Sequence, residues 1–302
     1  MTADLLARFP SYYHYTPGAK VSLDEARAYT QGIARGHYEN FTVVSWFLPK
    51  DKRQHFFNVY AYCRWSDDLG DEVGDPRLAL ELLNWWRDEL HACYADEPRH
   101  PVFVALLDTI RAFEIPMEPF DKLLTAFIQD QTVGRYETYE DLLGYCDNSA
   151  NPVGRLVLYL CGHRDEERQR LSDATCTALQ LTNFWQDVTV DWQKNRMYIP
   201  LEDLRRFGVT VDEIAEREFS DRFARVMQFE VERTRALFRE GLKLCDLLDG
   251  RVRRDIELFN RGGMTMLDLI ERQGYDVLSK RPALGKWGKV RLMLSRVLPF
   301  TG

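Results

Sequence analysis

The sequence contains no long hydrophobic run. Its most apolar stretch, residues 153–162, is interrupted by Arg155 and is far shorter than the roughly 20 residues that a membrane-spanning helix needs. The first 15 residues are mixed and aromatic, without the basic-then-apolar layout of a secretory signal. We therefore expect a cytoplasmic protein that does not cross a membrane.

Paired cysteines and an excess of basic residues are also missing. The six cysteines are scattered, with no pair at CxxC spacing and no histidine at zinc-site spacing, which predicts reduced thiols rather than disulfides or a zinc site. The formal net charge of -7 argues against a general nucleic-acid binder, because phosphate backbones are held by clustered Lys and Arg. With 45% apolar and 29% charged residues, the chain has the balance of a soluble globular protein.

Continuous Val/Ile/Thr runs of strand type are absent, and apolar residues recur at helical spacing, so we predict an all-α fold. Ser22 with Glu25 and Asp75 before Pro76 mark two helix starts. No long Gly/Ser-rich linker divides the chain, which favours one domain over residues 1–302. The predicted helices cover residues 22–46, 52–73, 76–95, 100–114, 117–133, 138–149, 152–162, 165–193, 219–248, 251–273 and 284–298.

Asp-x-x-x-Asp elements are present at Asp67/Asp71 and Asp187/Asp191. Residues four apart share one helical face, so each pair offers two mutually repelling carboxylates to one point, an arrangement suited to Mg²⁺ that bridges to a diphosphate. Spacing alone is weak support, because other acidic pairs share it, and three of these are expected on solvated faces as ordinary surface charge. They are Asp68/Glu72, Glu137/Asp141 and Asp212/Glu216.

The neighbours of the two pairs distinguish them from surface charge. The first follows the aromatic, apolar stretch Tyr60-Ala-Tyr-Cys-Arg-Trp-Ser, and the second follows Gln180-Leu-Thr-Asn-Phe-Trp-Gln, with Asn183 one turn before Asp187. Inward-facing carboxylates need cations nearby, and Mg²⁺ with Arg64 and Arg196 could supply them. Arg64 could equally be an intrahelical partner of Asp67 or Asp68.

These motifs, with Arg196-Met-Tyr198-Ile-Pro after them, resemble the squalene/phytoene synthase family from about His37 to the C-terminal helix. The resemblance implies an isoprenoid-synthase helical bundle with the two aspartate pairs on opposing walls of a central cavity. It implies Mg²⁺ ligation by Asp67, Asp71, Asn183, Asp187 and Asp191, and an isoprenoid diphosphate as substrate. His37 and Arg64 would contact the diphosphate, Tyr145 would sit beside the reacting carbons, and Phe41, Gln180, Asn183, Arg196 and Tyr198 would line the substrate site.

Tyr145 could instead be a core tyrosine and His37 a structural histidine. An organic cation needs aromatic walls, for which Phe41, Trp65, Tyr145, Phe184 and Trp185 are candidates, although such a stripe is more often core.

The motif departs from many family members, which carry Arg where this chain has Gln186 and Glu where it has Val190. Without that cation a substrate with one diphosphate becomes more plausible. The pattern, with Ser149-Ala-Asn-Pro, looks like the bacterial hydroxysqualene synthases of hopanoid biosynthesis. This branch would convert presqualene diphosphate to hydroxysqualene without consuming a nicotinamide.

Two other functions stay open at the level of sequence. One is the condensation of two farnesyl diphosphates to presqualene diphosphate, dehydrosqualene or squalene, and the other is an inactive scaffold or assembly factor of the same fold that would bind pathway-enzyme partners. The stretch from Arg281 to the C-terminus is amphipathic and basic. It is expected to dock on the protein body, with peripheral contact at the inner face of the membrane as the alternative.

Overall fold

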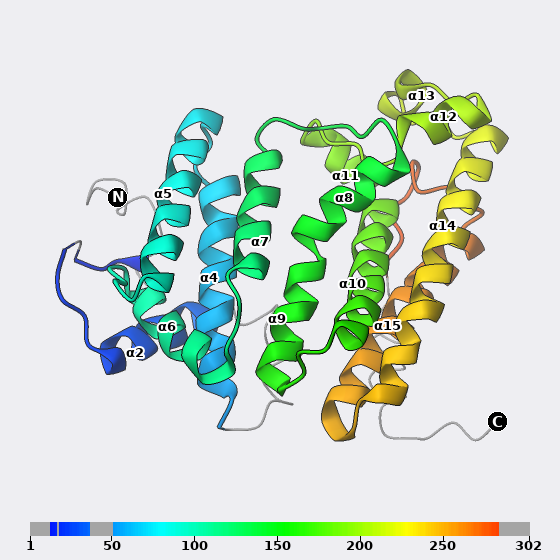
Figure 1. The fold of residues 1–302 in the computed structure, drawn as a ribbon. Coiled ribbons are helices and arrows are strands. Elements are labelled where there is room, and N and C mark those ends of the chain that lie inside the picture. Colours follow the sequence, from blue (N-terminus) through cyan, green and yellow to red (C-terminus); the bar gives the residue numbers. More distant parts are fainter. Residues whose placement is uncertain (1–12, 17, 37–50, 284–302) are drawn as a thin grey trace. The chain divides into compact units, whose positions relative to one another are not determined.

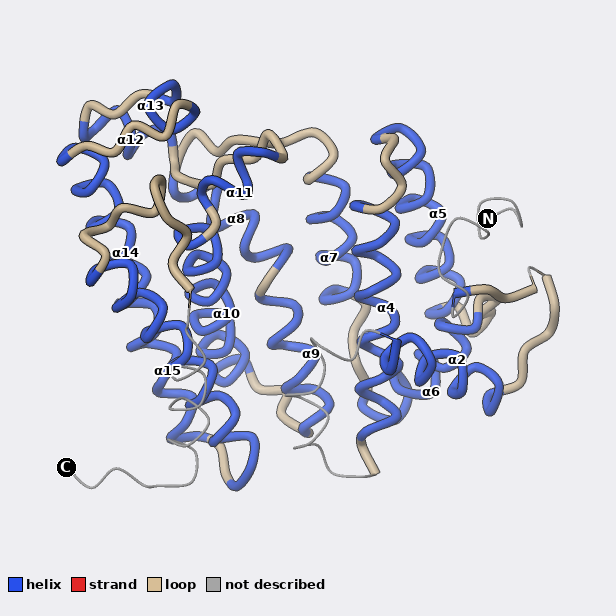
Figure 2. The backbone as a smooth tube through the Cα atoms, turned by 180° about the vertical axis from the view of Figure 1, so that it is seen from behind, coloured by secondary structure: helices blue, strands red, loops and turns tan. Residues whose placement is uncertain are grey.

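The computed structural model describes residues 13–16, 18–36 and 51–283, and in these ranges every regular element is a helix, as Figure 2 shows. The all-α prediction is confirmed. The chain forms two compact units, the first of residues 1–132 with 155–164 and the second of residues 133–154 with 165–302. Within the described ranges no helix is both long and apolar enough to span a membrane.

Helix α4 (Arg53–Asp71) is the centre of the first unit, where it contacts α2 (Leu23–Gly36), α5 (Pro76–Tyr94), α6 (Pro101–Phe113) and α7 (Glu118–Gln129) (Figure 1). Helix α5 begins as its sequence dictates, with Asp75 accepting from the backbone N–H of Arg77 and a proline at the first position. Tyr62, Trp65, Trp86 and Phe103 on α4, α5 and α6 form a buried aromatic core.

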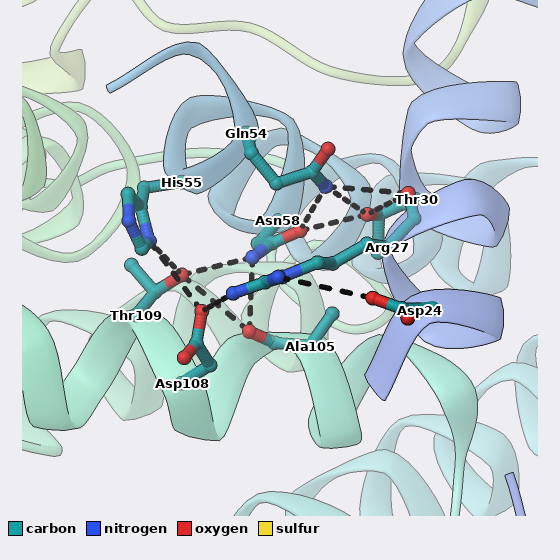
Figure 3. Close-up of polar contacts among 9 residues, drawn as sticks. All are labelled: Asp24, Arg27, Thr30, Gln54, His55, Asn58, Ala105, Asp108 and Thr109. Carbon is teal, nitrogen blue, oxygen red and sulfur yellow. Dashed lines mark hydrogen bonds and ion pairs between the residues drawn. The ribbon is translucent and has the colours of Figure 1, made fainter. Parts of the chain in front are cut away.

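A polar network lies between α2, α4 and α6 (Figure 3). The Asn58 side chain, which is fully buried, donates to the carbonyl of Ala105 at 2.9 Å and to Thr109 Oγ1 at 2.9 Å. Its oxygen accepts from Thr30 at 2.7 Å and from Gln54 at 2.9 Å. Because all four contacts of this one side chain are hydrogen bonds to neighbouring helices or to its own turn, the network fixes how α2 and α6 meet α4.

In the second unit α10 (Glu166–Gln186) packs against α14 (Asp221–Leu242) and α15 (Gly250–Arg272). The other elements here are α8 (Tyr139–Ser149), α11 (Val188–Gln193), α12 (Leu201–Phe207), α13 (Val211–Ala215) and the 3₁₀ helix η2 (Lys243–Leu247), while α9 (Asn151–Cys161) contributes to both units. Residues 134–137 run parallel to 197–202 through three backbone hydrogen bonds and one isolated bridge between Arg135 and Met197.

The predicted helices match the described ones closely except in four places. Residues 165–193 are not one helix, because the chain leaves helical geometry at Asp187 (φ -107°, ψ 16°), just before the poorly helix-forming residues Val188, Thr189 and Val190. The helix predicted over 219–248 ends at Leu242 and tightens into η2. Residues 117–133 are helical only to Gln129, and α12 and α13 were not predicted. The helix predicted over 284–298 and the end of the one over 22–46 lie outside the described residues.

Candidate active site

The first aspartate pair lies at the C-terminal end of α4. Arg64 contacts Asp67 one turn later, with 3.0 Å between Nη1 and Oδ2. The Asp67 side chain is 43% exposed and Asp71 is exposed. Burial raises the pKa of Asp67 to about 6, Arg64 opposes that rise, and the neighbouring carboxylate of Asp71 adds to it. The electrostatic effect of Asp71 is the repulsion expected from the i,i+4 spacing.

The carboxylate next in sequence is in a different environment. Asp68 is 3% exposed and accepts hydrogen bonds from the Tyr13 hydroxyl and from Arg64 Nη2. The expectation that Asp68 sits on a solvated face is therefore wrong, because position 68 faces the core rather than the side that carries Asp67 and Asp71. Arg64 pairs with both Asp67 and Asp68, so its intrahelical partnership is confirmed.

The second pair lies where α10 gives way to α11. Asp187 caps the end of one helix and the start of the other, and the backbone N–H of Asp191 donates to the carbonyl of Asp187 at 2.8 Å. Burial raises the pKa of Asp191 to about 7 and the Asp187 carboxylate raises it further, while Arg196 and more distant cations act against the rise. Asp191 therefore interacts electrostatically with both Asp187 and Arg196.

A cation that the sequence did not indicate lies beside this pair. Arg281, from the segment after α15, donates from Nε to Asp187 Oδ1 and from Nη2 to Asp187 Oδ2, the second at 3.0 Å. Gln186 donates to the carbonyl of Pro282 at 2.8 Å. Gln186 lacks the charge of the motif arginine, but the fold brings Arg281 to Asp187, and because 94 positions separate these two residues no local spacing predicts their contact.

Four aromatic rings cluster in space, and two of them, Phe184 and Tyr198, belong to the second motif or follow it closely in sequence. Phe184 and Tyr198 are stacked with centroids 3.6 Å apart, and Tyr145 lies 5.8 Å from Tyr198. Tyr136, which the sequence did not single out, stacks on Tyr198 at 5.9 Å. All four side chains are at most 8% exposed. The structure thus brings together two of the aromatic candidates, Tyr145 and Phe184, with Tyr198, which the resemblance places in the substrate site.

Two other aromatic candidates belong to the hydrophobic core. Trp65 is fully buried, stacked on Trp86 at 5.2 Å and in edge contact with Tyr13. Trp185 is also fully buried and donates its indole N–H to Thr234 at 2.8 Å. Both residues were candidates because they lie in the aromatic stretches beside the two motifs. The sequence alone could not distinguish a ring in the hydrophobic core from a ring that lines the substrate site.

The remaining candidates are placed as follows. Gln180 is partly buried and Asn183 is exposed, both on α10, where three- and four-residue steps put them on the same face as Asp187. Arg196 is partly buried, and its backbone N–H donates to the carbonyl of Asp191 at 2.9 Å. His37 and Phe41 lie outside the described residues.

The donor set suits one kind of metal site. Within residues 13–16, 18–36 and 51–283, no group of three or more His, Cys, Asp or Glu side chains is arranged to hold an ion by itself. Mg²⁺ in phosphate-handling sites is held by one or two carboxylates together with the phosphates of the substrate. Each aspartate pair supplies two repelling carboxylates, and Asn183 adds an amide oxygen on the same helical face. These residues therefore fit Mg²⁺ bound jointly with a diphosphate.

Comparison with known proteins identifies the family. The family model for squalene/phytoene synthase matches residues 34–288, which include both aspartate motifs. The chain belongs to the squalene/phytoene synthase family. It therefore has the all-α isoprenoid-synthase fold that the sequence motifs implied.

Relatives and solved structures agree with this assignment. The phytoene synthase of Thermus thermophilus is 31% identical over 262 residues, covering 86% of this chain and 89% of that protein. The crystal structure of the squalene synthase HpnC from Alicyclobacillus acidocaldarius has a TM-score of 0.80 and 46% identity, covering 85% of this chain and 97% of that one. A dehydrosqualene synthase crystallised with a ligand has a TM-score of 0.79 and 26% identity, covering 91% and 96% of the two chains.

Proposed function

We propose that this chain is a Mg²⁺-dependent enzyme that converts presqualene diphosphate to hydroxysqualene in bacterial squalene and hopanoid biosynthesis. Family membership supports an enzyme that uses prenyl diphosphates, and divalent-metal dependence is typical of the family. The observation that carries the finer proposal is the second motif, where Gln186 replaces the motif arginine and the neighbouring cation, Arg281, is already paired with Asp187. That arrangement favours a substrate with a single diphosphate.

The proposed reaction begins when the C–O bond to the diphosphate breaks and the diphosphate leaves with the electron pair. Mg²⁺, when bound, would neutralise charge that develops on the leaving group. Arg64 and Arg196 would add fixed positive charge, which acts most strongly when it is preorganised. Arg64 is held by ion pairs with Asp67 and Asp68, and Arg196 acts electrostatically on Asp191.

The cyclopropylcarbinyl cation left behind would rearrange next to aromatic rings. Tyr136, Tyr145, Phe184 and Tyr198 form a nearly dry cluster whose ring faces attract positive charge. Water would then attack the rearranged cation, form the new C–O bond and release one proton, giving hydroxysqualene. We propose further that both aspartate pairs act on one diphosphate.

Head-to-head condensation of two farnesyl diphosphates is the second candidate. Two observations favour it: the phytoene synthase relatives, and the structural similarity to a dehydrosqualene synthase. In both candidates the two aspartate pairs keep the same role, so only the substrate and product differ.

Product analysis tests the proposal. Purified protein is incubated with Mg²⁺ and either farnesyl or presqualene diphosphate, with and without NADPH, and the products are identified by mass spectrometry. Hydroxysqualene from presqualene diphosphate without NADPH is the expected result. Products formed from farnesyl diphosphate, or reduced products that need NADPH, would contradict the proposal and support the condensation reaction. No product from either substrate, with no thermal stabilisation by Mg²⁺ and diphosphate, would favour an inactive scaffold.

A further inference from the structure

The segment that follows α15 is a defined turn. Helix α15 ends at Arg272, and Gly274 and Tyr275 then take left-handed backbone angles (φ 67° and 64°). The Gln273 side chain donates to the carbonyls of Asp276 and Lys280, both at 2.5 Å. Val277 and Leu278 are buried, at 0% and 1% exposed. These contacts fold the segment into an ordered turn.

Two side chains join this segment, here called the strap (residues 276–283), to the second aspartate motif. Gln186 donates to the carbonyl of Pro282, and Arg281 donates to both oxygens of Asp187. Gln186 and Asp187 are adjacent, as are Arg281 and Pro282, so the two contacts form one clamp between two short stretches. The Asp187 side chain is 25% exposed and that of Arg281 is 50% exposed, so the ion pair is open to solvent on one side.

We propose that Gln186 is a positioning residue that holds the strap so that Arg281 occupies the Asp187 carboxylate, and that a divalent ion must displace Arg281 to bind there. This inference rests on the proposed function, in which Asp187 is a metal ligand. A guanidinium that binds both carboxylate oxygens occupies one lone pair of each and places a positive charge beside them, so it competes with a divalent ion for the same carboxylate. Metal binding therefore releases the strap from Asp187.

Metal binding without substrate provides the first test. Mn²⁺ alone is titrated into the full-length protein, and free Mn²⁺ is followed by electron paramagnetic resonance. Because a partly exposed bidentate pair is a modest competitor, R281Q is expected to bind Mn²⁺ about two- to fivefold more tightly than wild type. Q186A should show a smaller tightening. The control R222Q removes an arginine that is 51% exposed and paired with Glu213, and it should bind Mn²⁺ like wild type.

Limited trypsin digestion provides a second test that does not depend on activity. Cleavage after Lys280, identified by mass spectrometry, should be faster in Q186A and R281Q than in wild type and R222Q without metal. Wild type should approach the Q186A rate when Mn²⁺ is added. Rescue is tested with R281K, which keeps the charge but not the two-pronged contact and should fall between wild type and R281Q in Mn²⁺ affinity.

The outcomes separate this inference from the proposed function. The inference is rejected if folded R281Q binds Mn²⁺ no more tightly than wild type, or if Q186A has an unchanged cleavage rate after Lys280. Either result rejects it even if hydroxysqualene is formed. Absence of Mn²⁺ binding in every variant overturns the competition, whereas the metal-dependent function is tested separately by product formation with and without Mg²⁺.

Discussion

At the scale of single residues, Asp67 and Asp68 show how adjacent carboxylates on one helix take different roles. Asp68 is nearly fully buried and satisfied by Tyr13 and Arg64, whereas Asp67 is 43% exposed with its pKa raised to about 6. A helix turns by about 100° per residue, so one step is enough to move a side chain from the solvent-accessible face into the core. We therefore expect Asp68 to stabilise the fold and Asp67 to act in the reaction.

This assignment predicts opposite defects for two matched variants. D68N leaves Arg64 and Tyr13 without a buried anionic partner and should lower the free energy of unfolding by about 3–5 kcal/mol. D67N removes a carboxylate that is already repelled by Asp71, so its unfolding free energy should change by less than about 1 kcal/mol, while product formation falls at least about 100-fold. Urea unfolding and product assays measure the two effects. Equal stability losses in both variants would contradict the assignment.

A third variant tests the second pair. D191N should reduce product formation at least about 100-fold at saturating Mg²⁺ and weaken Mn²⁺ binding, because a neutral amide holds a divalent ion less well than a carboxylate. The variant should remain folded by circular dichroism, since it removes the repulsion between Asp191 and Asp187. E216Q is the control, because Glu216 is exposed and shares the i,i+4 acidic spacing with Asp212. Wild-type activity in D191N would remove this residue from the site.

At the scale of helices, the second unit depends on close approach between α10 and α14. A Cβ atom on Gly241 would lie 2.2 Å from Thr175 Oγ1 and 2.9 Å from the Thr175 backbone nitrogen. The Thr175 side chain could rotate away, but the backbone of α10 would have to move. Glycine at this position therefore sets the distance between the two helices.

We predict that G241A lowers the free energy of unfolding by about 1–3 kcal/mol through overpacking. G144A is the matched control, because Gly144 lies inside α8 with no atom within 4 Å of the added methyl. Alanine is the better helix former, so G144A should be unchanged or more stable by up to about 1 kcal/mol. Thermal and urea unfolding measure both effects. If G241A has the same free energy of unfolding as wild type, the two helices can move apart at little cost.

Most helices could be predicted from the sequence because their apolar periodicity extends over three or more turns, as in residues 53–71 and 76–94. Helices α12 and α13 have only seven and five residues, too few turns for a periodic signal. The capping box of Thr210 and Glu213 was the available sign of α13. The break at Asp187 was missed because the apolar pattern of α10 continues beyond it.

At the scale of the whole molecule, the limits of sequence reasoning lie in distant pairs. The motif aspartates could be predicted because each pair is local, four residues apart along the chain. Tyr13 at Asp68 and Arg281 at Asp187 could not, because 55 and 94 residues separate the partners. Only the fold brings such residues together, so the site combines local motifs with contacts that local spacing does not encode.

A buried ionic cluster in the second unit links three elements and should control the pH dependence of stability. Arg233 pairs with Glu230 on α14 and with Asp203 on α12, and its guanidinium lies 3.5 Å from the centre of the Tyr139 ring at the start of α8. The Glu230 side chain is fully buried. Burial raises the pKa of Glu230 to about 8, Arg233 acts against the rise, and Asp203 adds to it.

The sign of the effect follows from proton binding in the two states. In the unfolded chain Glu230 has its ordinary pKa near 4.5, so between about pH 4.5 and 8 the folded protein keeps a proton that the unfolded chain has lost. The stabilisation is complete below pH 4.5 and is lost as the pH rises through 8. The raised pKa values of Asp67 and Asp191, about 6 and about 7, act in the same direction at lower pH, so wild type should lose stability progressively between about pH 4 and 8.

E230Q isolates the contribution of Glu230, because glutamine cannot ionise but can still accept a hydrogen bond from Arg233. The dependence of unfolding free energy on pH should become shallower in E230Q by up to about 1.4 kcal/mol per pH unit, the limit for one proton. Urea unfolding of wild type, E230Q and the exposed-site control E140Q from about pH 6 to 8.5 measures the slopes. E140Q should keep the wild-type slope. If E230Q keeps it as well, Glu230 is ionised in the folded protein at neutral pH, and Arg233 then outweighs both the cost of burial and the charge of Asp203.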